Sequence, residues 1–210
     1  MSVLQEIREA VIEGQAKVVV PKVEQALQEG IDANTILHDA LIDAMGEVGQ
    51  LFEDGEFFVP EMLIAARAMS AALEVLKPQL VEQGIEPVGK VAIGTVKGDL
   101  HDIGKSLVAM MLEGAGFEII NLGVDVSPEK FIAEIKNGAQ IVAMSALLTT
   151  TMPNMKVTID AIKDAGLRDQ TVVLVGGAPV TSAYASEIGA DGYAPDASAA
   201  VRKAKELLGV

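Results

Sequence analysis

Hydrophobic positions in the first eighty residues recur at intervals of three and four, which is the spacing of one helix face. Four such stripes run over residues 3–12, 18–27, 36–45 and 62–76. Asp32 or Asn34 would cap the third helix, and Pro78 is expected to end the fourth. Glycines and two adjacent phenylalanines interrupt the pattern over residues 46–60. Four helices with short connections predict a helical bundle.

The pattern changes after a Gly- and Pro-containing segment, Glu82–Gly89, which reads as a linker between domains 1–83 and 90–210. Short apolar runs predict strands near 90–96, 117–122, 140–146, 171–176 and 190–193. Helical patterns follow them near 104–115, 127–137, 153–166, 179–188 and 197–208. The alternation predicts an α/β domain with a five-stranded parallel sheet of flavodoxin-like order 2-1-3-4-5, whose ligand crevice lies at the carboxyl ends of strands 1 and 3.

The amino-acid composition limits which side chains can form the core and which functional groups the protein can use. Half of the residues are apolar but only 3% are aromatic, so the core must be built from aliphatic side chains and methionine. The chain has no cysteine, which excludes disulfides, thiolate metal ligands and thiol nucleophiles. No apolar run reaches membrane-spanning length, and the first residues do not resemble a signal peptide. We therefore expect a soluble, cytoplasmic protein with no membrane partner.

The formal net charge of −14 argues against a nucleic-acid ligand, because phosphate binding needs clustered lysine and arginine. The charge is uneven: residues 1–89 hold 16 acidic and 5 basic residues, and residues 90–210 hold 14 and 11. A solvated acidic helix face explains most of this excess better than partner docking does.

The candidate chemistry begins with His101, in the sequence Asp99-Leu-His-Asp-Ile-Gly104 after the first predicted strand. One ring nitrogen of such a histidine can bind a metal while the other donates to Asp99, which orients the ring and raises its basicity. A strand-to-helix loop also uses Asp and His for capping, so this pattern alone is weak. The other histidine, His38, has no well-spaced carboxylate partner beyond Asp39, and packing or surface exposure explains it better.

Further unusual residues follow the predicted strands 3, 4 and 5. They are Ser145-Ala-Leu147 with Thr149, Thr150 and Thr151, then Gly176-Gly177-Ala-Pro, and finally Tyr193-Ala-Pro-Asp196. Each has an ordinary interpretation, since paired glycines form turns and Ser or Thr cap helices. Their joint position at one edge of the sheet makes a ligand site the stronger interpretation.

The chain closely resembles the cobalamin-binding module of corrinoid methyl-carrier proteins, methionine synthase and some mutases. The resemblance rests on Asp-x-His-x-x-Gly at 99–104, Ser-x-Leu at 145–147 and the pair Gly176-Gly177. The segments 45–52 and 58–69 resemble the helical cap domain of the same family. The likeness covers nearly the whole chain; a small departure is Ser106, where relatives often have asparagine.

The resemblance implies that His101 replaces the cofactor's own base as the lower ligand of cobalt in a base-off cobamide. Asp99 would accept the second ring N–H, and Ser145 would extend the relay, which makes these three the candidate catalytic residues. The cofactor would contact Asp99, His101, Asp102, Ile103, Gly104, Ser145, Leu147, Thr149, Thr150, Gly176 and Gly177. Phe58 and Met62 of the cap would shield the upper face of the cobalt, although both residues also fit a bundle core.

The expected function is a corrinoid protein that carries a methyl group on cobalt and is not catalytic on its own. The implied partners are a donor-specific methyltransferase, a second methyltransferase acting on tetrahydrofolate or a thiol coenzyme, and a reductive activator.

A cobalamin-dependent sensor is the alternative, but it should carry a DNA-binding or signalling domain beyond residues 1–210. A radical mutase subunit is a third possibility, but such subunits usually lack the helical cap, so residues 1–80 argue against it. A receiver domain would need a cluster of acids after strand 1 and a phospho-accepting Asp after strand 3, and residues 145–151 offer none. The methyl donor stays open.

Overall fold

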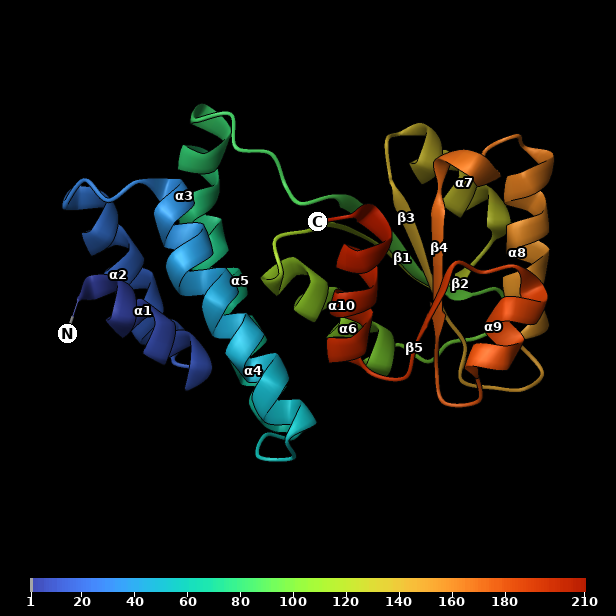
Figure 1. Ribbon diagram of the computed structural model, residues 1–210, viewed down its shortest axis with the longest axis horizontal. Helices are drawn as coiled ribbons and strands as arrows, with labels where there is room; N and C mark the ends of the chain where they lie inside the picture. The colour runs from blue at the N-terminus through green and yellow to red at the C-terminus, as the bar shows by residue number, and fades with distance from the viewer. Residues whose placement is uncertain (1) are drawn as a thin grey trace. The chain divides into compact units, whose positions relative to one another are not determined.

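The structure is a computed structural model that describes residues 2–210 (Figure 1). The chain divides into two compact units. The helical unit comprises Met1–Pro87 with Glu113–Gly116, and the sheet unit comprises Val88–Leu112 with Phe117–Val210. Each unit is described separately below.

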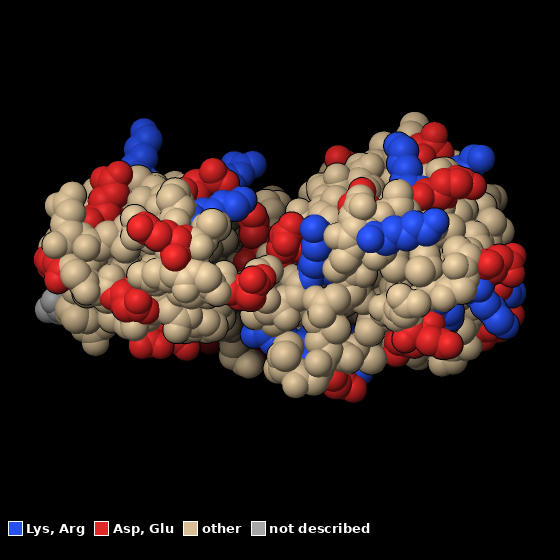
Figure 2. Space-filling model, turned by 90° about the horizontal axis from the view of Figure 1, so that it is seen from above, with Lys and Arg blue, Asp and Glu red and all other residues tan. Residues whose placement is uncertain are grey.

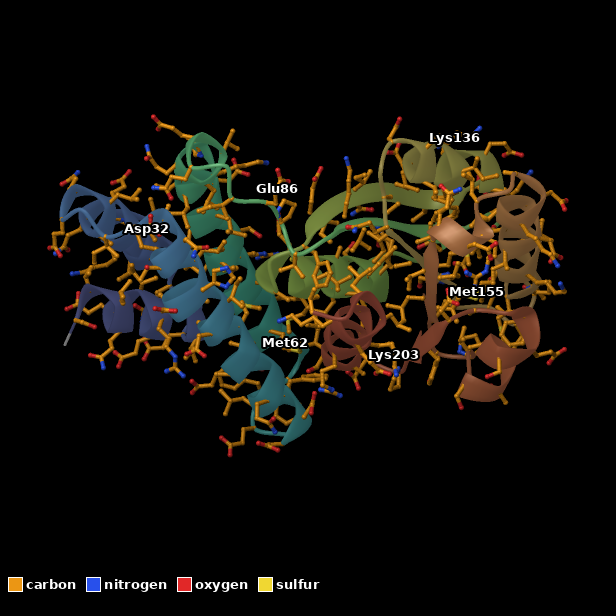
Figure 3. All side chains as sticks on the ribbon, turned by 45° about the horizontal axis from the view of Figure 1, so that its top comes forward. Asp32, Met62, Glu86, Lys136, Met155 and Lys203 are labelled. Carbon is orange, nitrogen blue, oxygen red and sulfur yellow. The ribbon has the colours of Figure 1, made fainter. Side chains whose placement is uncertain are left out.

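The helical unit is made of α1 (Val3–Ile12), α2 (Ala16–Gln28), α3 (Ala33–Ile36), the π-helical turn η1 (Leu37–Ile42), α4 (Asp43–Glu53) and α5 (Val59–Glu82). Asp32, labelled in Figure 3, is the N-cap of α3, and its carboxylate accepts from the backbone N–H groups of Asn34 and Thr35. The apolar stripes face inward: Ile7, Val23, Leu41 and Leu76 are fully buried. Burial of these stripes drives the helices together.

Two helix boundaries differ from the sequence prediction. Helical structure continues from Ala33 to Glu53 through Gly46, and α5 runs past Pro78 to Glu82. Proline lacks the amide donor and crowds the carbonyl of the preceding turn, which can bend a helix without ending it. The helix ends instead at Glu82, shortly before Gly84, whose φ of +68° is the left-handed conformation that terminates helices.

The sheet unit contains β1 (Lys90–Val96), β2 (Glu118–Val126), β3 (Ile141–Ser145), β4 (Val172–Gly176) and β5 (Gly192–Ala194). All neighbouring strands are parallel, and their order is β2-β1-β3-β4-β5. The predicted fold class and strand order are confirmed. β2 extends four residues beyond its predicted end, and its pairing with β1 shifts register between Gly94 and Val96.

Helices cover both faces of this sheet (Figure 1). One face carries α6 (Ile103–Gly114) and α10 (Ala197–Leu208), and the other carries α7 (Pro128–Lys136), α8 (Pro153–Asp164) and α9 (Ser182–Ile188). A short 3₁₀ turn, η2 (Arg168–Gln170), precedes β4. Phe131 and Met155 (Figure 3) are fully buried in the core between the sheet and α7–α9.

The carboxyl ends of four strands are in register across the sheet. Thr95 pairs with Ser145, Ser145 with Gly176, and Gly176 with Ala194. The loops that follow these strands therefore leave from the same edge of the sheet. This edge brings together residues that are far apart in the sequence.

Two observations concern helix hydropathy and surface charge. Among residues 2–210, no helix is long and apolar enough to cross a membrane. Figure 2 shows acidic and basic side chains interspersed over the visible face of the sheet unit. The visible face of the sheet unit therefore shows no patch of one charge sign.

Candidate functional site

His101 lies in the loop between β1 and α6, and half of its side chain (51%) is exposed. Its Nδ1 is 2.7 Å from Asp99 Oδ1, and its backbone N–H donates to the same oxygen at 3.1 Å. An ionised carboxylate can only accept hydrogen bonds, so Nδ1 carries the proton. The other ring nitrogen, Nε2, then keeps its lone pair and is available as a ligand.

Asp99 is fully buried beneath this histidine. Its Oδ2 accepts from Thr151 Oγ1 at 2.7 Å and from the backbone N–H of Leu147 at 2.8 Å, with a longer contact from Leu148 N–H at 3.4 Å. Burial raises the pKa of Asp99, but hydrogen bonds from Thr151, Leu147 and His101 outweigh it and hold the pKa well below its usual range. Asp99 is therefore an anion that fixes the tautomer of His101.

Ser145 is half-buried in β3, where it pairs with Thr95 and Gly176, and its place in the relay stays a prediction. The hydroxyl that reaches Asp99 in the structure is that of Thr151. The reason is geometric: the turn after β3 brings Thr151 back, with its backbone N–H bonded to the carbonyl of Leu148. Thr151 stood in the Thr149–Thr151 run of the sequence, but only the path of that turn distinguishes it from its neighbours.

The loop around His101 is also held by its backbone. Thr95 Oγ1, which is fully buried, donates to the carbonyl of His101 at 2.8 Å. Asn154, in the first turn of α8, donates through Nδ2 to the carbonyl of Lys97 at 2.7 Å. The histidine thus projects from a loop whose course is determined by β1 and α8.

Apolar side chains are exposed on the same loops. Leu100 and Ile103, which flank His101, are 71% and 79% exposed, and Leu147 and Leu148 are each 43% exposed. Water-exposed leucine and isoleucine of this extent on adjacent loops indicate a surface that is covered when the protein functions. The arrangement suits a large, mainly apolar ligand around one projecting imidazole.

The glycines of the predicted site differ in why the structure needs or tolerates a residue without a side chain. A Cβ on Gly104 would meet nothing within 4 Å, and Gly104 has an ordinary helical conformation, so open space lies beside it. Gly177 has a φ of +125°, and a Cβ there would lie 2.0 Å from the carbonyl oxygen of Ala146. A Cβ on Gly176 would lie 2.9 Å from the carbonyl of Ala194. The packing of the sheet unit therefore requires the Gly176–Gly177 pair, whereas Gly104 leaves room for a ligand.

Lys105, directly after Gly104, is a feature that the sequence analysis missed. Its side chain is 4% exposed, and Nζ donates to Asn121 Oδ1 at 2.7 Å. Burial lowers the pKa of Lys105, while the charge of Asp102 opposes that shift. An adjacent Gly-Lys pair at a helix start does not by itself indicate burial, so only the packing against β2 identifies this residue.

The remaining predicted residues are spread over both units. Asp102, Thr149 and Thr150 are exposed on loops at the carboxyl edge. Phe58 and Met62 belong to the helical unit, where Phe58 is 64% exposed and Met62 is fully buried. Met62 (Figure 3) is therefore a core residue of its helical unit, in line with the ordinary interpretation. His38 is exposed within η1.

Among residues 2–210 there is no group of three or more His, Cys, Asp or Glu side chains that could hold a metal ion. If His101 binds a metal, it does so without a second protein ligand from such a group. One imidazole fits a metal that arrives with most of its ligands supplied by a macrocycle.

Comparisons with known proteins agree with this reading. Residues 89–202 and residues 3–77 each match a family described as a B12 binding domain. The chain is 45% identical to dimethylamine corrinoid protein 1 of Methanosarcina acetivorans, over 98% of this chain and 97% of that protein. It is 40% identical to a corrinoid protein of Desulfitobacterium hafniense, over 100% of this chain and 99% of that protein.

A solved structure shares the fold across the whole length. A chain in the crystal structure of the methanol:cobalamin methyltransferase complex of Methanosarcina barkeri matches with a TM-score of 0.88 at 29% identity, over 99% of this chain and 80% of that chain. Two B12 binding domains, the parallel sheet and the exposed His101 over a buried carboxylate agree with one another. The chain therefore belongs to the family of corrinoid carrier proteins associated with methyltransferases.

Proposed function

We propose that this chain binds a base-off cobamide through His101 and carries a methyl group between two methyltransferases. The single observation that carries the proposal is the exposed imidazole of His101, whose Nδ1 bonds to a fully buried, ionised Asp99. This leaves Nε2 unprotonated and directed by a fixed partner, which is what a lower axial ligand requires.

The surrounding residues fit the rest of such a cofactor. Leu100, Ile103, Leu147 and Leu148 offer apolar surface to a macrocycle, and the open space at Gly104 admits a tail beside α6. When bound, the cobamide supplies the reaction, because its cobalt accepts a methyl group and releases it. The chain supplies ligation through His101, charge balance through Asp99, and orientation through the loops of the carboxyl edge.

A carrier of this kind needs enzymes that load and unload the methyl group. We expect a donor-specific methyltransferase, a second methyltransferase acting on tetrahydrofolate or a thiol coenzyme, and a reductive activator. The relatives named for dimethylamine and trimethylamine make methylated amines the first donors to test.

The ligation is tested by electron paramagnetic resonance of the full chain loaded with cobalamin and poised as cobalt(II). Samples with ¹⁵N-labelled histidine distinguish a protein imidazole from the base of the cofactor. We expect ¹⁵N coupling in the wild type and in His38→Ala, which serves as the control, and its loss in His101→Ala. Persistence of the coupling in His101→Ala would overturn the assignment.

The carrier role is tested with the same loaded protein. After reduction from cobalt(II) to cobalt(I) by an added low-potential chemical reductant, it should show no turnover with dimethylamine alone. With an added dimethylamine methyltransferase, the cobalt(I) absorption bands should give way to those of the methylated form. Steady turnover by the isolated chain would show that it is an enzyme in its own right. Binding of cobalamin without transfer to or from any methyltransferase would favour a sensor.

A further inference from the structure

Asp125 has an unusual backbone conformation at the end of β2. Its φ of +51° makes it the single non-glycine residue with positive φ among residues 2–210. The left-handed region is unfavourable for an L-residue, although aspartate tolerates it better than most residues. Local strain of this kind persists where surrounding contacts maintain it, so those contacts should reveal a role.

Two hydrogen bonds arise from this conformation, and both go to the loop that carries His101. Asp125 Oδ1 accepts from the backbone N–H of Gly98 at 2.7 Å. The backbone N–H of Asp125 donates to the carbonyl of Asp99 at 3.0 Å. Asp125 therefore bonds to the loop on both sides of the peptide that joins Gly98 to Asp99.

These two bonds add to the contacts that hold Asp99 in place. Its carboxylate is held from the β3 side by Leu147 N–H and Thr151 Oγ1, and Asp125 holds its backbone from the β2 side. The position of the Asp99 carboxylate then determines where the ring of His101 lies, through the 2.7 Å contact to Nδ1. Asp125 itself is exposed, so burial does not explain why a carboxylate stands in this conformation.

We infer that Asp125 is a positioning residue for His101, acting through the backbone of Asp99. The inference deepens the proposed function, on which its relevance to cobalt rests. A purely structural role, closing the end of β2 where its pairing with β1 is irregular, would leave the histidine unaffected by loss of the carboxylate.

Three substitutions separate the carboxylate from the backbone conformation. Asp125→Gly adopts positive φ without strain but loses the acceptor for Gly98 N–H. Asp125→Asn keeps a side-chain oxygen and tolerates the same φ, so it is the conservative rescue. Asp125→Ala loses the oxygen and also bears the strain, and Asp164→Asn on the exposed end of α8 is the matched surface control.

The first measurements use the full chain without cofactor. In Asp125→Gly, native-state hydrogen exchange of the Gly98 amide should speed up by about tenfold, the equivalent of one net hydrogen bond of about 1.4 kcal/mol. Long-range ¹H–¹⁵N spectra should show a smaller fraction of the Nδ1–H tautomer at His101, with His38 as an internal reference. Asp125→Ala should show at least the same changes, and Asp125→Asn and Asp164→Asn should resemble the wild type.

An unchanged His101 tautomer in both Asp125→Gly and Asp125→Ala would overturn the inference, even if exchange at Gly98 became faster, because that result is what a purely structural role predicts. The cobalt-loaded protein gives the second arm: the histidine-ligated fraction should fall in Asp125→Gly and recover in Asp125→Asn. If the wild type lacked histidine coupling, the proposed function would fail while the cofactor-free results still decided the role of Asp125. If the coupling were present but identical in all variants, the inference would fail and the proposed function would stand.

Discussion

Thr151 Oγ1 donates to Asp99 Oδ2 at 2.7 Å, joining the loop after β3 to the loop after β1 across 52 positions of sequence. Both side chains are buried, with 6% of Thr151 and none of Asp99 exposed. The bond lies on the far side of Asp99 from His101, so it stabilises the anion that orients the histidine. Several testable consequences depend on this arrangement and on its neighbours.

Loss of the Thr151 hydroxyl should weaken the sheet unit. Thr151→Val keeps the shape but leaves the buried carboxylate with one donor fewer, at a cost of about 1–3 kcal/mol in the free energy of unfolding. Thr151→Ser should retain most of the stability, and Ser145→Ala should have a smaller effect than Thr151→Val. Urea unfolding followed by tyrosine fluorescence measures this well, because both tyrosines, Tyr184 and Tyr193, lie in the sheet unit and the chain has no tryptophan. Equal losses in Thr151→Val and Ser145→Ala would contradict the observed relay.

Acid should remove the contribution of Asp99 to stability. The folded-state pKa lies below that of an unfolded aspartate, which is about 3.9. The contribution is therefore complete above pH values of about 5 and decreases as the pH falls through the unfolded and then the folded pKa. In cofactor-free protein, the difference in unfolding free energy between the wild type and Asp99→Asn should be largest near neutral pH and shrink on acidification. A difference that stays constant down to about pH 3 would show that ionisation of Asp99 does not contribute.

Alanine at the two kinds of glycine should have opposite effects. Gly177→Ala introduces a left-handed alanine whose Cβ lies 2.0 Å from the Ala146 carbonyl oxygen, so it should destabilise the sheet unit by more than about 2 kcal/mol. Gly104→Ala meets open space in a helix and should be neutral or stabilising by up to about 1 kcal/mol. Titration with hydroxocobalamin should nevertheless show weaker binding to Gly104→Ala, because the methyl group enters the space assigned to the ligand. Unchanged affinity would remove Gly104 from the cofactor site.

Lys105 and Asn121 should respond differently to substitution. Lys105→Met keeps the buried stem and removes a charge that is costly to bury, so its unfolding free energy should equal or exceed that of the wild type. Asn121→Ala leaves the buried ammonium without its amide acceptor and should lose about 1–3 kcal/mol. Urea unfolding of the two single variants and of the double variant checks the coupling. Loss of Asn121 should cost less in the Lys105→Met background, where only its bond from the Gly123 N–H is lost. A strong loss in Lys105→Met alone would show that the charge itself is required for the fold.

Local patterns in the sequence were sufficient for much of the architecture. The change from helical spacing to short apolar strands predicted an α/β sheet with a helical region before it, and the strand order followed from the common topology of five parallel strands. The pair of Asp99 and His101 was predictable because two positions in one short loop keep their side chains within reach. Pro78 was misjudged because a proline signal says nothing about the neighbouring hydrogen bonds that keep a helix intact.

Only the tertiary structure decided which distant residues complete the site. Ser145 and Thr151 carry the same hydroxyl chemistry, and the turn after β3 determined that Thr151 reaches Asp99. Nothing in the sequence marks Asp125 or Lys105 as unusual. Asp125 has its backbone conformation at the irregular end of β2, and Lys105 is buried where α6 meets that strand. The sequence by itself determines which groups are present and which lie within a few residues of one another. Contacts between loops depend on how each chain segment turns after its strand, and that course results from the packing of the whole unit.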